Sequence, residues 1–498
     1  AVAIDEYDAE GAIRNAQEFM RRSRALGGDY ASLEANPSAG STLNSAFRLQ
    51  GLNAWGQYYG DAVFDPFSGS AYLDQMLRGG ASPLVSSILP GVNMVTDNPN
   101  SAAFSSLFQG LLFNPHLISG RSRSAALLNR PFFEGAVGVG TTLNPGTEGW
   151  LGSLEFQSYA NEPVPFSTSF TLEYSKSPDN TRQIDNGVSL LESENELEVR
   201  DLSAYVTSTI TPDDRLVAYA SHSTAAFDMG VPFSIPQRFY GLDTTFTTAG
   251  IGWSHTIDYR NVVNTALLFS AFDFQRSLTE AIPPAYIGTT VGIAQKNYVA
   301  AVNHTVENGD LTWRYGAEGG LLDTVTSIAT DIFIPPIPRT QGYVADRENS
   351  YFARAYVDLT HDIAPGLKAE YGLFGTIWGA EGEDTRHLDP RVGLAFAPAD
   401  GQWLRAGYIR ESIDSTTPTL APIGIVGLQS NEFSVGSEGY SDTLAFKWDA
   451  EWTDRFFTTV DYQHQVFQDL SISDALVASK FDFAEAQQSV ADILHRPA

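Results

Sequence analysis

Few residues of this sequence have the spacing of a known catalytic, metal-binding or cofactor-binding motif. The eight histidines are scattered, and His255, His304 and His464 fall on predicted strands, where a surface or lumen side chain is the simpler interpretation. No zinc-protease, phosphate-loop or dinucleotide-binding motif is present. Cysteine is absent, which excludes disulfides, thiolate metal sites and cysteine nucleophiles. We therefore predict that the protein is not an enzyme and has no resident cofactor.

One acidic run is the strongest candidate for binding an ion. Glu192, Glu194, Glu196 and Glu198 stand at alternate positions, and carboxylates are the ligands that calcium prefers. A solvated, charged outer loop is the alternative that the composition favours, because 59 acidic residues face 30 basic ones and the net charge is -29. A field of this sign repels nucleic acid, so we expect no nucleic-acid partner.

Strands must position most of the polar side chains. From Arg130 onward, apolar and polar residues alternate almost to the end of the chain, as they do in strands with one apolar face. In residues 311–321, Leu, Trp, Tyr and Ala lie on one face, and Thr, Arg and Glu lie on the other. No run of about eighteen apolar residues offers a transmembrane helix.

A soluble two-sheet sandwich also alternates, and three features favour a membrane barrel over it. The predicted strands have about ten residues or more, whereas strands of soluble sheets usually have about five or six. Charges of both signs recur on the polar face, while Trp and Tyr crowd the apolar one. Short turns such as Glu307–Asp310 alternate with long connections such as Thr326–Asn349, as periplasmic turns and outer loops do.

We therefore predict a mainly β protein, a transmembrane antiparallel β-barrel over residues 129–498. Counting the alternating segments gives about fifteen strands, and because an even number is expected we estimate about sixteen, within a range of roughly fourteen to eighteen. Residues 474–498 alternate poorly, which leaves open whether the barrel closes within this chain.

The polar faces of the strands should line the lumen. The charged residues that we expect there are Arg314, Glu318, Arg354, Asp358, Lys368, Glu370, Lys447, Asp449, Glu451 and Asp461. Two connections are unusually apolar, and their candidate contact residues are Ile332, Phe333, Ile334, Ile337, Leu420, Ile423 and Ile425. Exposed apolar loops mark contacts. These two would either meet a protein partner outside or fold into the barrel mouth as a constriction.

The first 128 residues have the periodicity of helices. Residues 12–20 form one amphipathic stripe, and a second helix is predicted over 42–64. Small and aromatic residues at its end resemble the second helix of a tetratricopeptide repeat, and an ordinary helical hairpin is the alternative. We predict a helical periplasmic segment over residues 1–77 that lies outside the lumen. Residues 78–128 should form a linker with one short helix.

One hairpin resembles those of TonB-dependent receptors. Asp389-Pro390-Arg391-Val392-Gly393 leads through a short turn to Trp403-Leu404-Arg405-Ala406-Gly407-Tyr408, as a Pro-Arg-x-Gly strand precedes a Leu-Arg-Ala-Gly-Tyr strand in that family. Helical repeats before such a barrel are also similar to polysaccharide-export porins. The resemblance implies the outer membrane of a Gram-negative bacterium, with membrane lipid and lipopolysaccharide around the barrel. The plug of those receptors contains strands, whereas helices are predicted here.

Three functions remain after these exclusions. The leading hypothesis is a conduit for export or surface assembly of a polymer or protein. The second is an outer-membrane anchor that does not transport and binds a surface partner through its long loops. The third is an uptake receptor of the TonB-dependent type. A periplasmic or surface protein partner is compatible with each of them.

Overall fold

The structure is a computed structural model of the chain. It describes residues 9–25, 37–50, 52–62, 65–76, 101–117, 122, 125–126, 128–144, 147–185, 190–231, 237–380, 383–399, 401–413, 417–430, 439–453 and 456–468.

Fifteen antiparallel strands form one sheet, in which each strand pairs with the next along the chain. The strands are β1 (Phe132–Asn144), β2 (Thr147–Ala160), β3 (Phe166–Asp185), β4 (Leu190–Thr209), β5 (Asp214–Val231), β6 (Gln237–Asp258), β7 (Asn261–Ile282), β8 (Ala285–Asn308), β9 (Leu311–Phe333), β10 (Thr340–Ala364), β11 (Leu367–Ala380), β12 (Glu383–Phe396), β13 (Gln402–Glu411), β14 (Tyr440–Thr453) and β15 (Phe456–Gln468). The prediction of a mainly β, antiparallel meander is confirmed.

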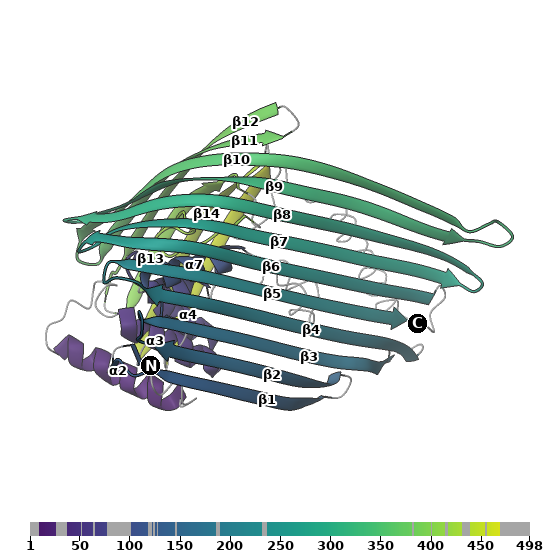
Figure 1. The fold of residues 1–498 in the computed structure, drawn as a ribbon, viewed down its shortest axis with the longest axis horizontal. Coiled ribbons are helices and arrows are strands. Elements are labelled where there is room, and N and C mark those ends of the chain that lie inside the picture. Colours follow the sequence, from purple (N-terminus) through teal and green to yellow (C-terminus); the bar gives the residue numbers. More distant parts are fainter. Residues whose placement is uncertain are drawn as a thin grey trace.

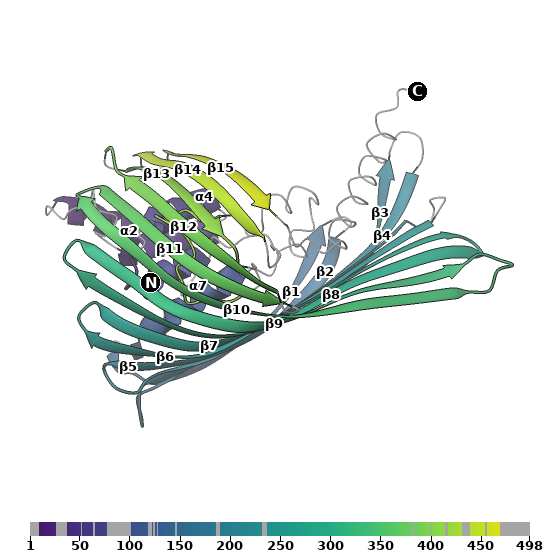
Figure 2. The same cartoon turned by 90° about the horizontal axis from the view of Figure 1, so that it is seen from above.

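The sheet curves into an open trough and does not close into the predicted barrel (Figure 2). Within the described part of the chain, β1 pairs only with β2, and β15 pairs only with β14. The trough therefore has fifteen strands and two free edges, in place of the estimated sixteen strands in a ring. Residues 474–498, where the alternation was poor, lie outside the described residues.

Several strands are much longer than the sequence suggested. β9 and β10 pair without a break from Ile332↔Thr340 to Leu311↔His361, so the connection that was expected over 326–349 is a strand hairpin with a short tip. β-Branched residues such as Val325 and Thr326 extend the ladder. The 23 residues of β9 span about 75 Å at ~3.3 Å per residue, far more than the ~30 Å of a bilayer core.

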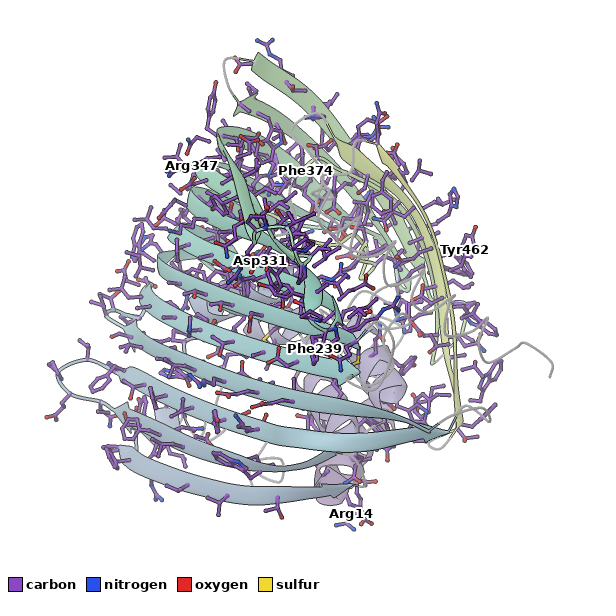
Figure 3. The ribbon with its side chains drawn as sticks, turned by 90° about the vertical axis from the view of Figure 1, so that its right-hand side faces the viewer. Arg14, Phe239, Asp331, Arg347, Phe374 and Tyr462 are labelled. Carbon is purple, nitrogen blue, oxygen red and sulfur yellow. The ribbon has the colours of Figure 1, made fainter. Side chains whose placement is uncertain are left out.

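The two faces of the trough differ in polarity. Along β9, Arg314 and Glu318 are buried on the concave face, whereas Trp313 and Leu321 are exposed on the convex face. The same alternation continues in β10 and β14. Figure 3 shows Tyr462 of β15 and Arg347 of β10 pointing away from the trough. Along Leu311–Leu321 the convex face is apolar and the concave face carries buried charges, as the alternation predicts.

Five helices in the described part of the chain lie in the concavity, towards the end where the short turns are (Figures 1 and 2). They are α2 (Ala9–Ala25), α3 (Pro37–Leu49), α4 (Asn53–Ala62), α5 (Gly69–Met76) and α7 (Ser101–Phe113). The helix predicted over 42–64 is divided between α3 and α4, and α5 lies in the remainder of the helical segment predicted over 1–77. No described helix combines the length and the apolar character needed to cross a membrane.

Helices α3 and α4 pack against the wall of the trough beside its short turns, and the periplasmic location of residues 1–77 stays a prediction. Tyr58 of α4 donates a hydrogen bond to the carbonyl oxygen of Gly401, 3.0 Å away in the turn before β13. Aromatic residues of α3 and α4 share a buried cluster with Trp403 and Phe457 of the wall. The tetratricopeptide-like interpretation of residues 1–77 stays a prediction.

Helix α7 is a core element, and the prediction of a linker over 78–128 misses its role. Its side chains Phe108, Leu111 and Leu112 have no exposed surface. They pack with inward residues of β5 to β11 in the largest buried cluster of the protein. Two glycines of β6 make the approach feasible, because a Cβ atom on Gly250 would lie 2.6 Å from the Phe108 ring.

This close approach gives the first prediction. Gly250→Val should lower the free energy of unfolding by about 1–3 kcal/mol, because the added atoms overlap the Phe108 ring. The matched control is Gly375→Val on β11, where a Cβ atom meets nothing within 4 Å. Denaturant titration in detergent micelles measures both variants. Equal losses in the two variants would show that α7 does not sit on β6.

Candidate functional site

The connection between β13 and β14 folds back into the trough. We call its residues 417–430 the inner loop. Leu420 is 1% exposed and Ile425 is 0% exposed, and Ile423 is partly buried. These residues are thus not displayed on an outer loop for a partner, and the constriction is the alternative that their burial matches. In the other apolar connection, Ile334 and Ile337 are exposed, and Ile332 and Phe333 at the end of β9 are partly exposed.

A tight turn at the end of the inner loop is held by the wall. Ile425 and Leu428 exchange two backbone hydrogen bonds of 2.8 and 2.7 Å. Between them, Val426 and Gly427 have φ angles of 42° and 78°, a left-handed conformation that a β-branched residue seldom adopts. The backbone N–H of Val426 donates to the Glu370 carboxylate of β11. Such backbone strain persists only where its surroundings determine it.

Glu318 of β9 and Arg354 of β10 clamp the start of the inner loop. The two side chains form a buried ion pair. The hydroxyl of Thr419 lies 2.7 Å from the Glu318 carboxylate and 2.7 Å from an Arg354 guanidinium nitrogen. The carbonyl oxygen of Leu420 accepts hydrogen bonds from Asn303 at 2.9 Å and from Tyr356 at 3.3 Å. One polar patch of the wall therefore provides hydrogen-bond partners for both the backbone and a side chain of the inner loop.

A second group of charges lies beside the first. Arg314 of β9 donates to Asp358 of β10 at 3.0 Å and also pairs with Glu370. Arg391 of β12 donates to the carbonyl oxygen of Pro422 at 2.8 Å and to Glu411 at 3.0 Å. Burying charge is costly unless it is paired and hydrogen-bonded. The inner loop supplies part of that pairing.

Helix α7 completes the assembly from the other side. The hydroxyl oxygen of Ser105 accepts a hydrogen bond of 2.9 Å from the backbone N–H of Thr419. The Gln109 amide donates to the carbonyl oxygens of Thr419 and Ala421 at 3.2 and 3.3 Å. We call α5, α7 and the inner loop together the inner plug. One side of this plug meets the wall through apolar contacts of α7. The other side meets it through the charges described above and through small apolar clusters around Ala421 and Ile425.

The remaining charged residues expected in the lumen lie elsewhere on the wall. Lys447 and Asp449 of β14 are buried with Arg405 of β13, which donates to Asp449 at 2.8 Å. Lys368 pairs with Asp362 at 3.1 Å beside a short turn. Two further residues lie near the free edge: Glu451 is partly buried and Asp461 is exposed on β15.

The acidic run does not form an ion site in the described part of the chain. Glu196 and Glu198 of β4 both pair with Lys176 of β3, and Arg200 pairs with Glu198. The side chains of Glu192 and Glu194 lie outside the described residues. No group of three or more His, Asp or Glu side chains that could hold a metal ion occurs among the described residues.

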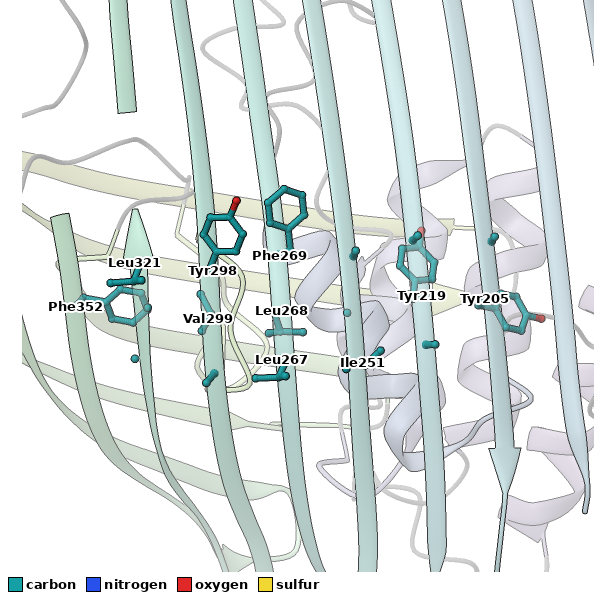
Figure 4. Close-up of a pocket in the computed structure, with 18 of the residues that line it drawn as sticks. Tyr205, Tyr219, Ile251, Leu267, Leu268, Phe269, Tyr298, Val299, Leu321 and Phe352 are labelled. Atoms are coloured by element: carbon teal, nitrogen blue, oxygen red, sulfur yellow. The ribbon is translucent and has the colours of Figure 1, made fainter. Parts of the chain in front are cut away.

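A shallow apolar hollow of about 980 Å3 crosses the middle of β4 to β10 (Figure 4). The strand register puts small residues, including Ala218, Ala249 and Gly319, on the convex face there. Larger exposed side chains such as Leu267 and Tyr298 border them. The hollow has no charged lining residue, so it offers no acid–base or metal chemistry.

Sequence reasoning missed several residues of this site. Ser105 and Gln109 lie on a short predicted helix, and nothing in their spacing indicates a contact with residues some three hundred positions later. Arg391 and Arg405 were quoted only as parts of a motif. A possible signal was available in the polar Gln109 within an otherwise apolar helix, because a buried amide requires partners.

Comparisons with known proteins give structural similarities of low score. No family model matches the chain, and no curated protein matches it. The ferripyoverdine receptor of the Pseudomonas aeruginosa outer membrane has a TM-score of 0.46 and 11% identity, over 70% of this chain and 50% of that one.

Two further structures are similar to the same degree. The siderophore receptor PiuA from Acinetobacter baumannii has a TM-score of 0.43 and 10% identity, over 68% of this chain and 56% of that one. The FrpB iron transporter from Neisseria meningitidis has a TM-score of 0.41 and 12% identity, over 68% and 55%. The chain thus spans little more than half the length of these structures. With TM-scores below 0.5, the function of this chain has to be argued from its own geometry.

The clamp gives the second prediction. Glu318→Ala should lower the free energy of unfolding by about 3–5 kcal/mol, because it leaves the Arg354 guanidinium buried without its carboxylate. The double variant Glu318→Leu with Arg354→Met should recover much of that loss, since no charge is then left unpaired. Denaturant titration is the measurement, with exposed Glu348→Ala as the control. A double variant no more stable than Glu318→Ala would contradict the clamp.

Proposed function

We propose that the chain is an outer-membrane transport protein of the receptor type, in which an inner plug closes the passage until a ligand or partner displaces it. The observation that supports this proposal is the filling of the trough. α7 and the inner loop occupy the space in front of the wall and bind it through buried charges. This proposal replaces the open export conduit that the sequence favoured.

The membrane location rests on the convex face. Along β9, the exposed apolar residues run from Trp313 to Leu321, and polar Asp323 follows on the same face. The Leu311–Leu321 segment has the length of about 9–11 residues that a tilted membrane strand needs. On β10, Tyr351 stands opposite Leu321, and polar residues begin just beyond it. An apolar band bordered by aromatic residues is typical of outer-membrane strands.

The chemistry of the plug interface favours a movable plug over a permanent filling. The inner loop contacts the wall through hydrogen bonds to charged side chains and through two small apolar clusters around Ala421 and Ile425. Water can replace the hydrogen bonds when the loop moves, so their net cost of separation is small, and both apolar clusters are smaller than the one around α7. The apolar contacts of α7 with β5 and β6 cannot be replaced in this way. The passage would therefore open along the side of β9 to β12.

Conductance tests this proposal directly. In planar lipid bilayers, the wild-type protein should show no steady open channel. Glu318→Gln combined with Glu370→Gln should raise the open probability, because both acceptors of loop N–H groups are weakened. The matched control is Asp449→Asn, which disturbs the buried pair with Arg405 on β13 and β14.

Two outcomes would overturn the proposal. A wild-type protein that conducts steadily is an open conduit, and the plug does not close it. A folded double variant that conducts no more than the wild type supports the anchor hypothesis, in which the inner plug never moves. Circular dichroism, and the change of gel mobility when the sample is heated, show whether the variant is folded.

A further inference from the structure

The β9–β10 hairpin extends beyond the neighbouring strands and leaves one strand edge open. β10 pairs with β9 from Thr340 to His361, but its pairing with β11 begins only at Ser350. Residues 340–349 therefore have no partner on their second side among the described residues. They are exposed on both faces, with Tyr343 at 70% and Val344 at 71%. Figures 1 and 2 show the hairpin projecting past β11 and β12.

This edge carries the charged residues Asp346, Arg347 and Glu348 but lacks the other features that usually block strand addition. Native edges carry proline, lysine, a bulge or a covering loop, whereas residues 340–349 contain neither proline nor lysine. The pairing with β9 is continuous through them, without a bulge. Every second residue of such an edge turns its N–H and C=O groups outward. The edge can therefore accept another strand.

The negative charge of this edge favours a partner with basic side chains. The two arginines in the projecting part of the hairpin are already paired: Arg347 donates to Asp323 at 2.8 and 2.7 Å, and Arg339 pairs with Asp331. Asp346 and Glu348 lie on the opposite face from Arg347 because their positions alternate with it. Their neighbours on β9 are Thr326 and Thr324. No described cation neutralises these two carboxylates.

We propose that the free edge of β10, residues 340–349, binds an extended segment of a protein partner that carries basic side chains two positions apart. The segment adds as a further strand, and the backbone provides most of its hydrogen bonds. Its basic side chains lie over Asp346 and Glu348, which fixes the register. A second copy of this chain is a poorer occupant, because each copy carries a net charge of -29 and the copies repel each other.

Binding of designed peptides to the full chain in detergent tests the proposal. A fluorescent peptide with alternating threonine and lysine, as long as the free edge, should raise its anisotropy on binding. The double variant Asp346→Lys with Glu348→Lys should bind the lysine peptide with an affinity lower by about tenfold or more. It should also bind the matching peptide that carries glutamate in place of lysine. Asp213→Lys with Asp258→Lys, at exposed turns of the opposite end, is the control and should change neither affinity.

Backbone methylation separates strand addition from simple charge attraction. Methylating one set of alternate amides of the lysine peptide should abolish binding, and methylating the other set should not. Equal binding of both methylated peptides, or unchanged affinity of the charge-reversed protein, would overturn the proposal. The proposal would also be overturned if the wild-type protein were a dimer and Tyr343→Pro made it a monomer, because the free edge would then pair with a second copy of the chain.

Discussion

The burial of charge on the concave face is the constraint on which the rest of the structure depends. Arg314, Glu318, Arg354, Asp358 and Glu370 are each less than a tenth exposed. Charges in such surroundings are stable only when they are paired and their remaining hydrogen-bonding groups are satisfied. The strands supply part of this pairing across β9, β10 and β11, and the backbone and hydroxyl groups of the inner loop supply the rest.

Glycines on the wall let the plug approach closely on both of its sides. On the apolar side, Gly250 and Gly252 face Phe108 of α7. On the charged side, a Cβ atom on Gly393 would lie 2.7 Å from Val426, and one on Gly407 would lie 2.9 Å from Ile425. The plug is thus fitted in shape on both sides, and the hydrogen bonds that water can replace lie on the inner-loop side, beside apolar clusters smaller than the one around α7. This asymmetry is the physical basis for a passage that opens on one side.

The sequence predicted the wall better than its contents. The alternation in residues 311–321 separates buried Arg314 and Glu318 from exposed Trp313, because a strand has a period of two whatever its surroundings. Leu420 and Ile425 show the limit, since an apolar loop has the same composition whether it meets a partner or folds inward. Closure could not be predicted either, because the number of strands depends on pairing between segments far apart in the chain.

The central claim is that the inner loop and α7 meet inside the trough, and crosslinking tests it most directly. The chain has no cysteine, so Ser105→Cys with Thr419→Cys introduces the only thiol pair. A short bifunctional thiol reagent, applied to membranes before extraction, should link the two positions, and mass spectrometry of the digest should find the joined peptides. The pair Leu321→Cys with Tyr351→Cys, opposite each other on the wall, reports that the reagent works. Linkage of the wall pair without linkage of Ser105→Cys and Thr419→Cys would contradict the account.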